Sequence, residues 1–433
     1  MKTGIKLIDL ARGTDILGKY KELVRLWDNK SPLEEARNKN LAGFLLAIRS
    51  QNRFYSPLLG RYSPDEIIDN PQKVLTDMPV IDKKMLSENQ HLVFTPVKGV
   101  DYQLKKTGGS TGEPFRYYVD KEHLSWMWAH NYLFWHNNCG YEPGEPFVTI
   151  AGNSLRTVNK KFSESIYHKL QNNYFLKGDM IDNNLKPDLS KLKKAVLIYG
   201  YPSSILNIIK SVPEFSSHFK GLRAIFTTSE QLIPSVRRQI EAAFNKPVFD
   251  IYGANDGGIL GCECPEHQGY HYNFLNCFAE TLTTEDGFTE LLLTNTNSQN
   301  YPFIRYRVGD IGSITSDRCI CGSAWPRIID LKGRTRDLIR KPDGGSIHGA
   351  YFNKILFDFP EVDAYRIVQE TDYSVTVYIH LKQMQLFDKM ATKLTATLNK
   401  LLPELSFSIV QMQEYNPTNA KFKLIESHVN QSM

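Results

Sequence analysis

Apolar residues recur at helical spacing through the first hundred positions. The clearest example runs from Ile16 to Ile48, where aliphatic and aromatic residues return every three or four positions. This period predicts amphipathic helices. Nothing in this part of the chain suggests chemistry, so we expect a helical region at the periphery of the fold.

The middle of the chain alternates short apolar runs with helical stretches. The runs Lys194–Gly200, Ala224–Glu230 and Pro247–Gly253 are typical of buried strands. The segments between them, Ser203–Ser211 and Ile233–Phe244, have the period of helices. This order predicts a parallel sheet covered by helices, whose ligands bind beyond the carboxyl ends of the strands. Polar residues stand at those three ends: Gly200-Tyr201-Pro202, Ser229-Glu230 and Tyr252–Asp256.

The segment Ser125–His136 predicts a helix rich in aromatic rings. Such a stripe usually packs against a sheet, although it could also line a pocket for an aromatic or apolar substrate. His130 and His136 have no patterned carboxylate or cysteine beside them, and we interpret both as structural.

The end of the chain predicts a separate small domain. From Leu338 onward, strands over 364–368, 374–379 and 407–410 accompany a helix at Phe387–Leu401. The predicted fold class is therefore α/β. It has a large N-terminal domain over residues 1–337 with helix-covered mixed or parallel sheets, and a small C-terminal α+β domain over residues 338–433.

Composition excludes some classes of protein. The 433 residues are 41% hydrophobic and 23% charged, and the net charge of +5 is too small for this length to indicate a nucleic-acid partner. No apolar run reaches the roughly 18 residues that a membrane crossing needs, which predicts no membrane insertion. The first residues lack the apolar segment of a signal peptide, so we expect a cytoplasmic protein.

The segment Thr107–Pro114 reads Thr-Gly-Gly-Ser-Thr-Gly-Glu-Pro. Its small side chains let the backbone approach an anion closely, and its hydroxyls add donors, so it is a candidate phosphate-binding loop. It is not a Walker loop, because Glu113 and not lysine follows Gly112. The apolar run Phe115–Val119 indicates that the loop joins two strands. A plain solvent-exposed turn is the alternative.

Four of the six cysteines form two C-x-C pairs, Cys262 with Cys264 and Cys319 with Cys321. In a cytoplasmic protein of this size, such pairs suit a metal better than disulfides. Buried free thiols are the alternative. Cys139 and Cys277 are expected in the core.

Four ordered motifs resemble the adenylate-forming enzymes, in the branch of phenylacetate-coenzyme A ligases and CapK-like proteins. The glycine loop is similar to the phosphate loop of this family. The other motifs are Tyr252–Asp256, similar to Y-G-x-x-E; Tyr301–Asp310, similar to P-x-x-R-Y-x-x-G-D; and Gly333–Asp337, similar to the G-R-x-x-D hinge. Lys421 sits where the family carries a glycine-lysine pair, and the resemblance spans residue 100 to the C-terminus.

The resemblance implies a two-step reaction, in which a carboxylate attacks the α-phosphate of ATP and a thiol or amine then displaces AMP. It implies that the loop binds phosphates together with Mg²⁺, and that the C-terminal domain is mobile about the hinge. Asp310 would bind the ribose hydroxyls, with Arg334 near the ribose or phosphate, and Lys421 would bridge the carboxylate and the α-phosphate. The nucleotide-binding residues implied are Thr107, Gly108, Gly109, Ser110, Thr111, Gly112, Ser229, Glu230, Gln231, Tyr252, Gly253, Asp310 and Arg334, with Ser229 to Gln231 bordering the adenine and Tyr252 stacking on it.

The sequence departs from the family at four positions. Asp256 replaces the metal-associated glutamate, Ala420 replaces the glycine before Lys421, and Phe115 replaces the lysine after the loop proline. At the hinge, Arg336 stands where Asp or Lys is common. A nucleotide-binding protein that has lost turnover is therefore the alternative to an enzyme.

The resemblance also favours a metal set, Cys264, His267, Cys319 and Cys321, with Cys262 and His271 as alternates. Four such ligands make a closed, structural Zn²⁺ site. We expect it within residues 258–325 and near the active site.

The predicted function is ATP-dependent activation of a small carboxylic acid, followed by transfer to a thiol. Coenzyme A is the first choice of acceptor by resemblance, and the phosphopantetheine of a carrier protein is the alternative thiol. An amine acceptor would make the protein an acyl-amide ligase of polysaccharide or natural-product biosynthesis.

Overall fold

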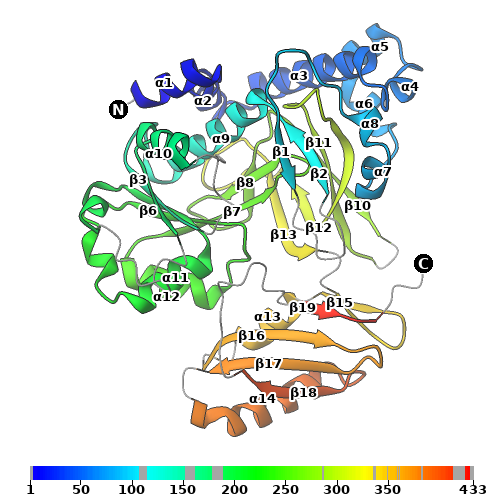
Figure 1. The fold of residues 1–433 in the computed structure, drawn as a ribbon. Helices are drawn as coiled ribbons and strands as arrows, with labels where there is room; N and C mark the ends of the chain where they lie inside the picture. Colours follow the sequence, from blue (N-terminus) through cyan, green and yellow to red (C-terminus); the bar gives the residue numbers. More distant parts are fainter. Residues whose placement is uncertain are drawn as a thin grey trace.

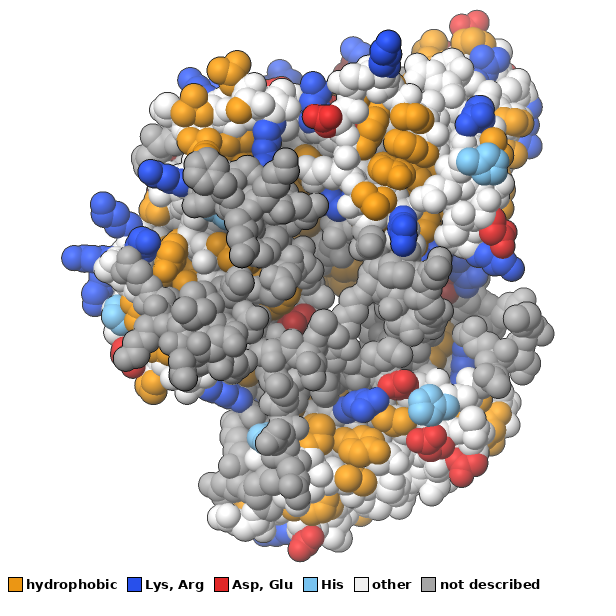
Figure 2. All heavy atoms as spheres, in the orientation of Figure 1, with side chains coloured by type: hydrophobic (Ala, Val, Ile, Leu, Met, Phe, Trp, Pro, Cys, Tyr) orange, Lys and Arg blue, Asp and Glu red, His pale blue; other side chains and the backbone are white. Residues whose placement is uncertain are grey.

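The computed structural model describes residues 3–106, 115–151, 161–177, 189–284, 287–334, 338–348, 350–357, 359, 361–381, 384–412 and 425–429. Within these residues, no helix has both the length and the apolar character that a membrane crossing requires. Figure 2 shows Lys and Arg side chains scattered over the drawn face rather than gathered in one place.

The N-terminal region is helical, which confirms the prediction from its period. Its caps explain two of the helix starts: Asp15 accepts a hydrogen bond from the Gly18 amide, and Ser63 and Glu66 form a capping box. The helices are α1 (Thr3–Arg12), α2 (Ile16–Leu26), α3 (Lys30–Gln51), α4 (Ser56–Leu59), α5 (Pro64–Asp69), α6 (Pro71–Thr76), α7 (Lys83–Glu88) and α8 (Gln90–Val93).

One sheet of 11 strands forms the centre of the large domain, in the order β10-β11-β12-β13-β9-β8-β7-β6-β5-β3-β4. Strands β7, β6, β5, β3 and β4 are parallel, as the alternating pattern predicts, and the remainder is antiparallel. The strands are β3 (Phe147–Ala151), β4 (Asn173–Lys177), β5 (Leu197–Gly200), β6 (Ala224–Thr228), β7 (Val248–Ala254), β8 (Ile259–Glu263), β9 (Tyr270–Tyr272), β10 (Cys277–Thr283), β11 (Thr289–Asn295), β12 (Phe303–Thr315) and β13 (Arg327–Arg334).

Helices cover this sheet (Figure 1). The aromatic segment forms most of α9, whose Trp135 and Tyr132 are fully buried among the rings of the sheet, so its rings serve core packing as expected. The helices are α9 (Lys121–Cys139), α10 (Lys161–Leu170), α11 (Pro202–Ser211) and α12 (Pro234–Phe244), with short 3₁₀ turns at Leu189–Lys194 and Phe215–His218.

A two-stranded hairpin, β1 (Gln103–Lys106) and β2 (Arg116–Val119), flanks the glycine-rich segment. The strands are antiparallel with Lys106 opposite Arg116, so this segment joins two paired strands, as predicted. Phe115, just before β2, and Tyr117 on β2 pack into a second apolar core with rings from β12.

The small domain has its own core, whose buried members fall between Ile339 and Ile425. Its four-stranded sheet has the order β18-β17-β16-β19, and it lies below the large domain in Figure 1. The boundary between the two domains was expected after residue 337. Because residues 335–337 lie outside the described residues, this boundary stays a prediction. The elements are β14 (Leu338–Arg340), β15 (Ser346–His348), α13 (Ala350–Phe357), β16 (Val362–Gln369), β17 (Val375–Leu381), a 3₁₀ turn (Met384–Leu386), α14 (Phe387–Leu401), β18 (Phe407–Gln411) and β19 (Ile425–Ser427).

Candidate active site

The carboxyl ends of β5, β6 and β7 lie at one edge of the central sheet, because these strands are parallel neighbours. The chain leaves this edge through polar residues, including Ser229 and Asp256. Ser229 has a φ of 69°, a left-handed conformation that costs free energy for a residue with a side chain. Such strain, at the edge where open α/β sheets bind ligands, marks a candidate site.

Tyr252 and Asp310 meet at this edge. The Tyr252 hydroxyl at the end of β7 donates a hydrogen bond of 2.7 Å to Asp310 Oδ2 on β12. Asp310 is buried, and it is directly opposite Arg334 on β13. The structure therefore brings three of the predicted nucleotide residues to one place, although the side chain of Arg334 lies outside the described atoms.

Asp256 has two aromatic neighbours that the sequence did not assign to the site. The Tyr306 hydroxyl donates a 3.1 Å hydrogen bond to Asp256 Oδ2. Burial, and then the nearby Asp256 carboxylate, raises the pKa of Tyr117 above its ordinary value. Tyr306 stands inside the Tyr301–Asp310 motif, which was a signal, whereas nothing local to Tyr117 indicated a contact with residue 256.

Glu230 joins two loops of the edge. Its carboxylate accepts hydrogen bonds from the amide and hydroxyl of Ser203, at 3.1 and 2.8 Å, in the first turn of α11. Burial raises the pKa of Glu230, and the hydrogen bonds from Ser203 act in the opposite direction. Gln231 is exposed beside it, and Gly253 lies within β7 opposite Leu260.

Two predicted elements lie outside the described residues: Lys421 and the loop Thr107–Gly112, with its members Gly108, Gly109, Ser110 and Thr111. Their roles stay predictions. The residue after the loop proline is described, however. Phe115 is 3% exposed and contacts the rings of Tyr117, Tyr301 and Phe303, so this position belongs to the apolar core.

A group of metal-ligating side chains lies elsewhere in the large domain. The ligand atoms of Cys264, His271, Cys319 and Cys321 all lie within 4.8 Å of one another. Cys264 Sγ is 3.7 Å from Cys319 Sγ, and Cys321 Sγ is 3.3 Å from His271 Nε2. We call these four residues the Cys/His cluster.

His267, expected in this group, lies outside it, and His271 takes its place. His267 stacks on the ring of Phe249, and its Nδ1 is 3.1 Å from the Glu263 carboxylate. His271 Nδ1 is 2.9 Å from the carbonyl oxygen of Trp325, which directs Nε2 toward Cys321. Burial lowers the pKa of His271 to about 4 and so favours the neutral imidazole that binds metals.

The expectation that this group lies near the active site stays a prediction, and the strand pairing gives its direction along the sheet. β8 is antiparallel to β7, with Leu260 opposite Gly253 and Cys262 opposite Ile251. Each step from Leu260 toward Cys264 therefore moves away from the edge that holds Asp310. At about 3.3 Å per residue, Cys264 is roughly 17 Å along the strand from the carboxyl end of β7.

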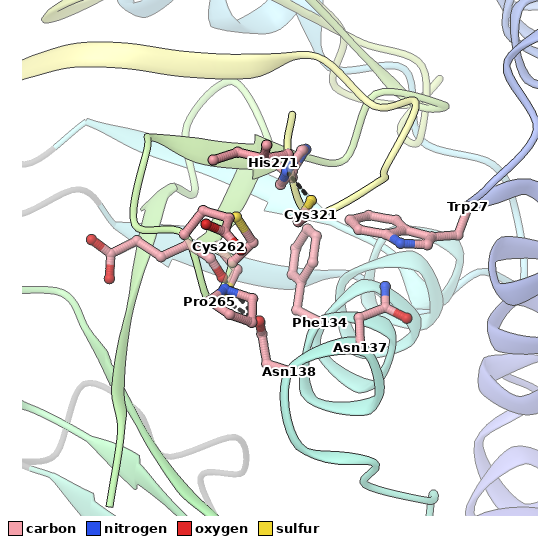
Figure 3. Close-up of a pocket in the computed structure, with 12 residues that line it drawn as sticks. Trp27, Phe134, Asn137, Asn138, Cys262, Pro265, His271 and Cys321 are labelled. Carbon is pink, nitrogen blue, oxygen red and sulfur yellow. Dashed lines mark hydrogen bonds between the residues drawn. The ribbon is translucent and has the colours of Figure 1, made fainter. Parts of the chain in front are cut away.

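A pocket of about 290 Å³ lies beside the Cys/His cluster (Figure 3). His271 and Cys321 form part of its wall, and the rings of Trp27 and Phe134 form another part. Asn138 on α9 donates to the Glu263 carbonyl oxygen at 3.0 Å, so the end of α9 is fixed beside the pocket.

Comparisons with known proteins fit this architecture. The chain is 24% identical to Protein CapK of Staphylococcus aureus over 373 residues, which are 83% of this chain and 81% of CapK. It is 26% identical to a phenylacetate-coenzyme A ligase of Thermus thermophilus over 144 residues, 31% of this chain and 32% of the ligase. No protein-family model matches the sequence.

Two solved ligases share the fold. A 2-hydroxyisobutyryl-CoA ligase in the postadenylation state, in complex with R3-HIB-AMP, superposes with a TM-score of 0.73 and 16% identity over 94% of this chain and 91% of the ligase. An anthranilate-CoA ligase in complex with anthranoyl-AMP gives 0.52 and 15% identity over 81% of this chain and 73% of the ligase.

The first ligase in its thioesterification state, with 2-HIB-AMP and CoA, gives a TM-score of only 0.54, at 16% identity over 93% of this chain and 91% of the ligase.

Proposed function

We propose that this chain, a member of the adenylate-forming superfamily in the branch of CapK and phenylacetate-coenzyme A ligases, activates a small carboxylic acid with ATP and passes the acyl group to a thiol. The observation that carries the proposal is the Tyr252–Asp310 hydrogen bond at the strand-end edge, with Arg334 opposite Asp310. A buried carboxylate at this edge offers the two acceptor oxygens that a ribose diol requires.

In the first step, a carboxylate oxygen attacks the α-phosphorus of ATP, and the bond to pyrophosphate breaks to leave an acyl-adenylate. Asp310 would hold the ribose, and Tyr252 would lie against the adenine. Lys421 would neutralise the charge that develops between the carboxylate and the phosphate. Asp256 would hold Mg²⁺, directly or through water, and the metal would share the charge of the phosphates.

In the second step, a thiol sulfur attacks the acyl carbon and gives up its proton, the bond between the acyl carbon and the phosphate oxygen of the mixed anhydride breaks, and AMP leaves. Coenzyme A is the acceptor we propose, because the ligases with the same fold have it in their names and one was solved with it bound. A carrier-protein thiol or an amine are the other acceptors to be tested. The proposal includes the cytoplasmic location expected from the sequence.

We also propose that the Cys/His cluster holds a structural Zn²⁺. Three thiols and one imidazole whose ligand atoms lie within 4.8 Å of one another fit the donor set and the number of ligands of closed zinc sites. The Trp325 carbonyl oxygen beside His271 supplies the outer contact that commonly orients a zinc-bound imidazole. Zinc there would join β8 and β9 to the turn that contains Cys319 and Cys321.

The test of the first step is exchange of labelled pyrophosphate into ATP with a panel of carboxylic acids. We expect exchange with at least one acid above the background without acid. Lys421→Ala should abolish it while ATP binding is retained. Absence of exchange in zinc-loaded, ATP-binding protein would instead support the non-catalytic alternative.

The acceptor is then identified with the activated acid. Coenzyme A, a phosphopantetheinylated carrier protein and a panel of amines are each added, and the product is analysed by mass spectrometry. A thioester of coenzyme A is expected. An amide formed without coenzyme A would show an acyl-amide ligase.

A further inference from the structure

Lys105 has an unusual position for a lysine. It lies on β1 directly opposite Tyr117 on β2. Residues directly opposite in an antiparallel pair point to the same face, with Cβ atoms about 5 Å apart. Tyr117 is 2% exposed on the inner face of the hairpin, so Lys105 extends from that same inner face and is itself partly buried.

No carboxylate among the described residues forms an ion pair with Lys105. Burial alone lowers its pKa below the ordinary value, and no acidic neighbour acts in the opposite direction. The partly buried guanidinium of Arg237, in contrast, makes two hydrogen bonds to Glu263. A partly buried cation without an anion is costly, and proteins normally pair such charges.

His123, in the first turn of α9, is the second incomplete group. It is 9% exposed, and its Nδ1 is buried with no hydrogen-bond partner. Burial lowers the pKa of His123 to about 4; the Asp120 carboxylate opposes this effect, and the Lys105 ammonium adds to it. Asp120 alone separates β2 from α9, so the first turn of α9, which contains His123, directly follows the hairpin on which Lys105 lies opposite Tyr117. Among the described residues, neither the Lys105 ammonium nor His123 Nδ1 has a hydrogen-bond or ion-pair partner, and an anionic oxygen could supply one to both.

The two residues lie at the substrate end of the fold. The far end of α9 is fixed to Glu263, beside the Cys/His cluster, so its first turn faces the opposite edge of the sheet. Asp120, which caps α9, accepts a hydrogen bond from Asn300 at 2.7 Å, and Asn300 immediately precedes the Tyr301–Asp310 motif. On the same hairpin face, Tyr117 contacts the ring of Phe303, which contacts Tyr306, the residue that donates a hydrogen bond to Asp256.

We propose that Lys105 and His123 form a binding site for an anionic oxygen group of a substrate, either the carboxylate of the acid or a phosphate of the nucleotide. The ammonium supplies charge and donors, and the imidazole donates from Nδ1 in the tautomer that carries hydrogen there. The identification of the anion as a substrate group rests on the proposed function. The inference that Lys105 and His123 bind an anion together is independent of that function.

The first test measures anion binding without catalysis. Melting temperatures of wild type, Lys105→Met, His123→Phe and the exposed control Lys84→Met are compared in chloride, acetate, benzoate and inorganic phosphate at constant ionic strength. When no stabilising anion is present, Lys105→Met should melt at the wild-type temperature or above, because the change removes an unpaired charge. The anion that raises the melting temperature of wild type and Lys84→Met should fail to do so in the other two variants.

Protection by acetate or benzoate would assign the site to the carboxylate, and protection by phosphate would assign it to the nucleotide. If every anion stabilises Lys105→Met as much as wild type, the proposed site is wrong.

The second test uses pyrophosphate exchange with the acid found to be active. Lys105→Met should raise the KM of the acid or of ATP about 10- to 100-fold, the loss typical of one charge-assisted hydrogen bond. Lys84→Met should leave both values unchanged. If wild type is active and Lys105→Met retains both KM values, the anion site is wrong while the proposed function stands. If wild type shows no exchange, the melting experiment still decides on the anion site.

Discussion

The two ends of β7 and β8 hold two different kinds of site. At the carboxyl end of β7, the polar groups form separate pairs: Tyr252 with Asp310, and Tyr306 with Asp256. At the other end, all four members of the Cys/His cluster converge on one point. The two ends therefore differ in the kind of ligand that each could bind. On the proposed function, one ion would complete the cluster, whereas the edge would bind a substrate large enough to touch several pairs.

This contrast predicts that the two ends fail differently. Loss of the cluster should weaken the fold and leave the chemistry of intact molecules unchanged. Loss of a group at the edge should impair turnover and leave the fold unchanged. The predictions below test this separation, beginning with the largest effect.

Removal of zinc should cost the most stability. We expect Cys319→Ser and His271→Ala to lose bound zinc and to melt about 10 °C or more below wild type, because the binding free energy of a structural metal is also folding free energy. Metal content by mass spectrometry and melting by circular dichroism check this. His267→Ala is the matched control, since its imidazole contacts Glu263, Phe249 and Arg237 and is partly exposed. If His267→Ala lost its zinc and His271→Ala kept it, the ligand set expected from the sequence, with His267 instead of His271, would be correct.

Loss of the edge carboxylate should have the next largest effect. Asp310→Ala removes the acceptor for the ribose hydroxyls, and hydrogen bonds to a charged group are each worth about 1.5–3 kcal/mol. We expect kcat/KM for ATP in pyrophosphate exchange to fall about 100- to 1,000-fold, with zinc content unchanged. If Asp310→Ala kept the wild-type kcat/KM for ATP, Asp310 would not bind the ribose, and the proposed function would lose its main support.

Asp250 lies on β7 between the two ends, so a change at Asp250 tests the strand that connects them. Thr227 and Tyr270 donate hydrogen bonds to its carboxylate, at 2.7 and 2.9 Å. Burial is the largest influence and raises its pKa from 3.8 to about 6. A raised carboxyl pKa means that the folded state binds the proton more tightly than the unfolded state does.

The contribution of Asp250 is therefore fully present below pH 4 and is lost as pH rises to about 6, a change of about 3 kcal/mol. Asp250→Asn has no such titration. The difference in free energy of unfolding between wild type and Asp250→Asn, measured by denaturant from pH 4 to pH 8, should change by this amount within that window. A constant difference would show that Asp250 is ionised throughout.

The sequence predicted what depends on neighbours along the chain. The strands at 197–200, 224–228 and 248–254 were predicted because apolar runs and helical periods are local patterns. The same holds for the helical N-terminal region and for the strands on both sides of the glycine loop. Three of the four members of the Cys/His cluster also came from local pairs of cysteines.

Pairing between distant strands could not be predicted in this way. His267 follows Cys264 at a spacing typical of metal sites, but antiparallel pairing of β8 and β9 places His271 opposite Cys262 and next to the cluster. Tyr117 and Asp256 are likewise linked only through β12: Tyr117 contacts Phe303, Phe303 contacts Tyr306, and the Tyr306 hydroxyl donates to Asp256. The position of the cluster along the sheet has the same cause, because the direction of β8 is a property of the sheet.

Tyr252→Phe should give the smallest effect and the finest test of the separation between the two ends. The change removes the hydroxyl that donates to Asp310 Oδ2 and keeps the ring that would stack on adenine. One hydrogen bond to a carboxylate oxygen is in question, so we expect kcat/KM for ATP to fall about 3- to 10-fold, with zinc content and melting temperature unchanged. Comparison of ATP with 2′-deoxy-ATP and 3′-deoxy-ATP shows where the loss arises. If Tyr252 holds Asp310 for the ribose, the variant should discriminate less against the deoxy nucleotides, whereas an equal loss with all three would mean that the hydroxyl acts only on the fold of the edge.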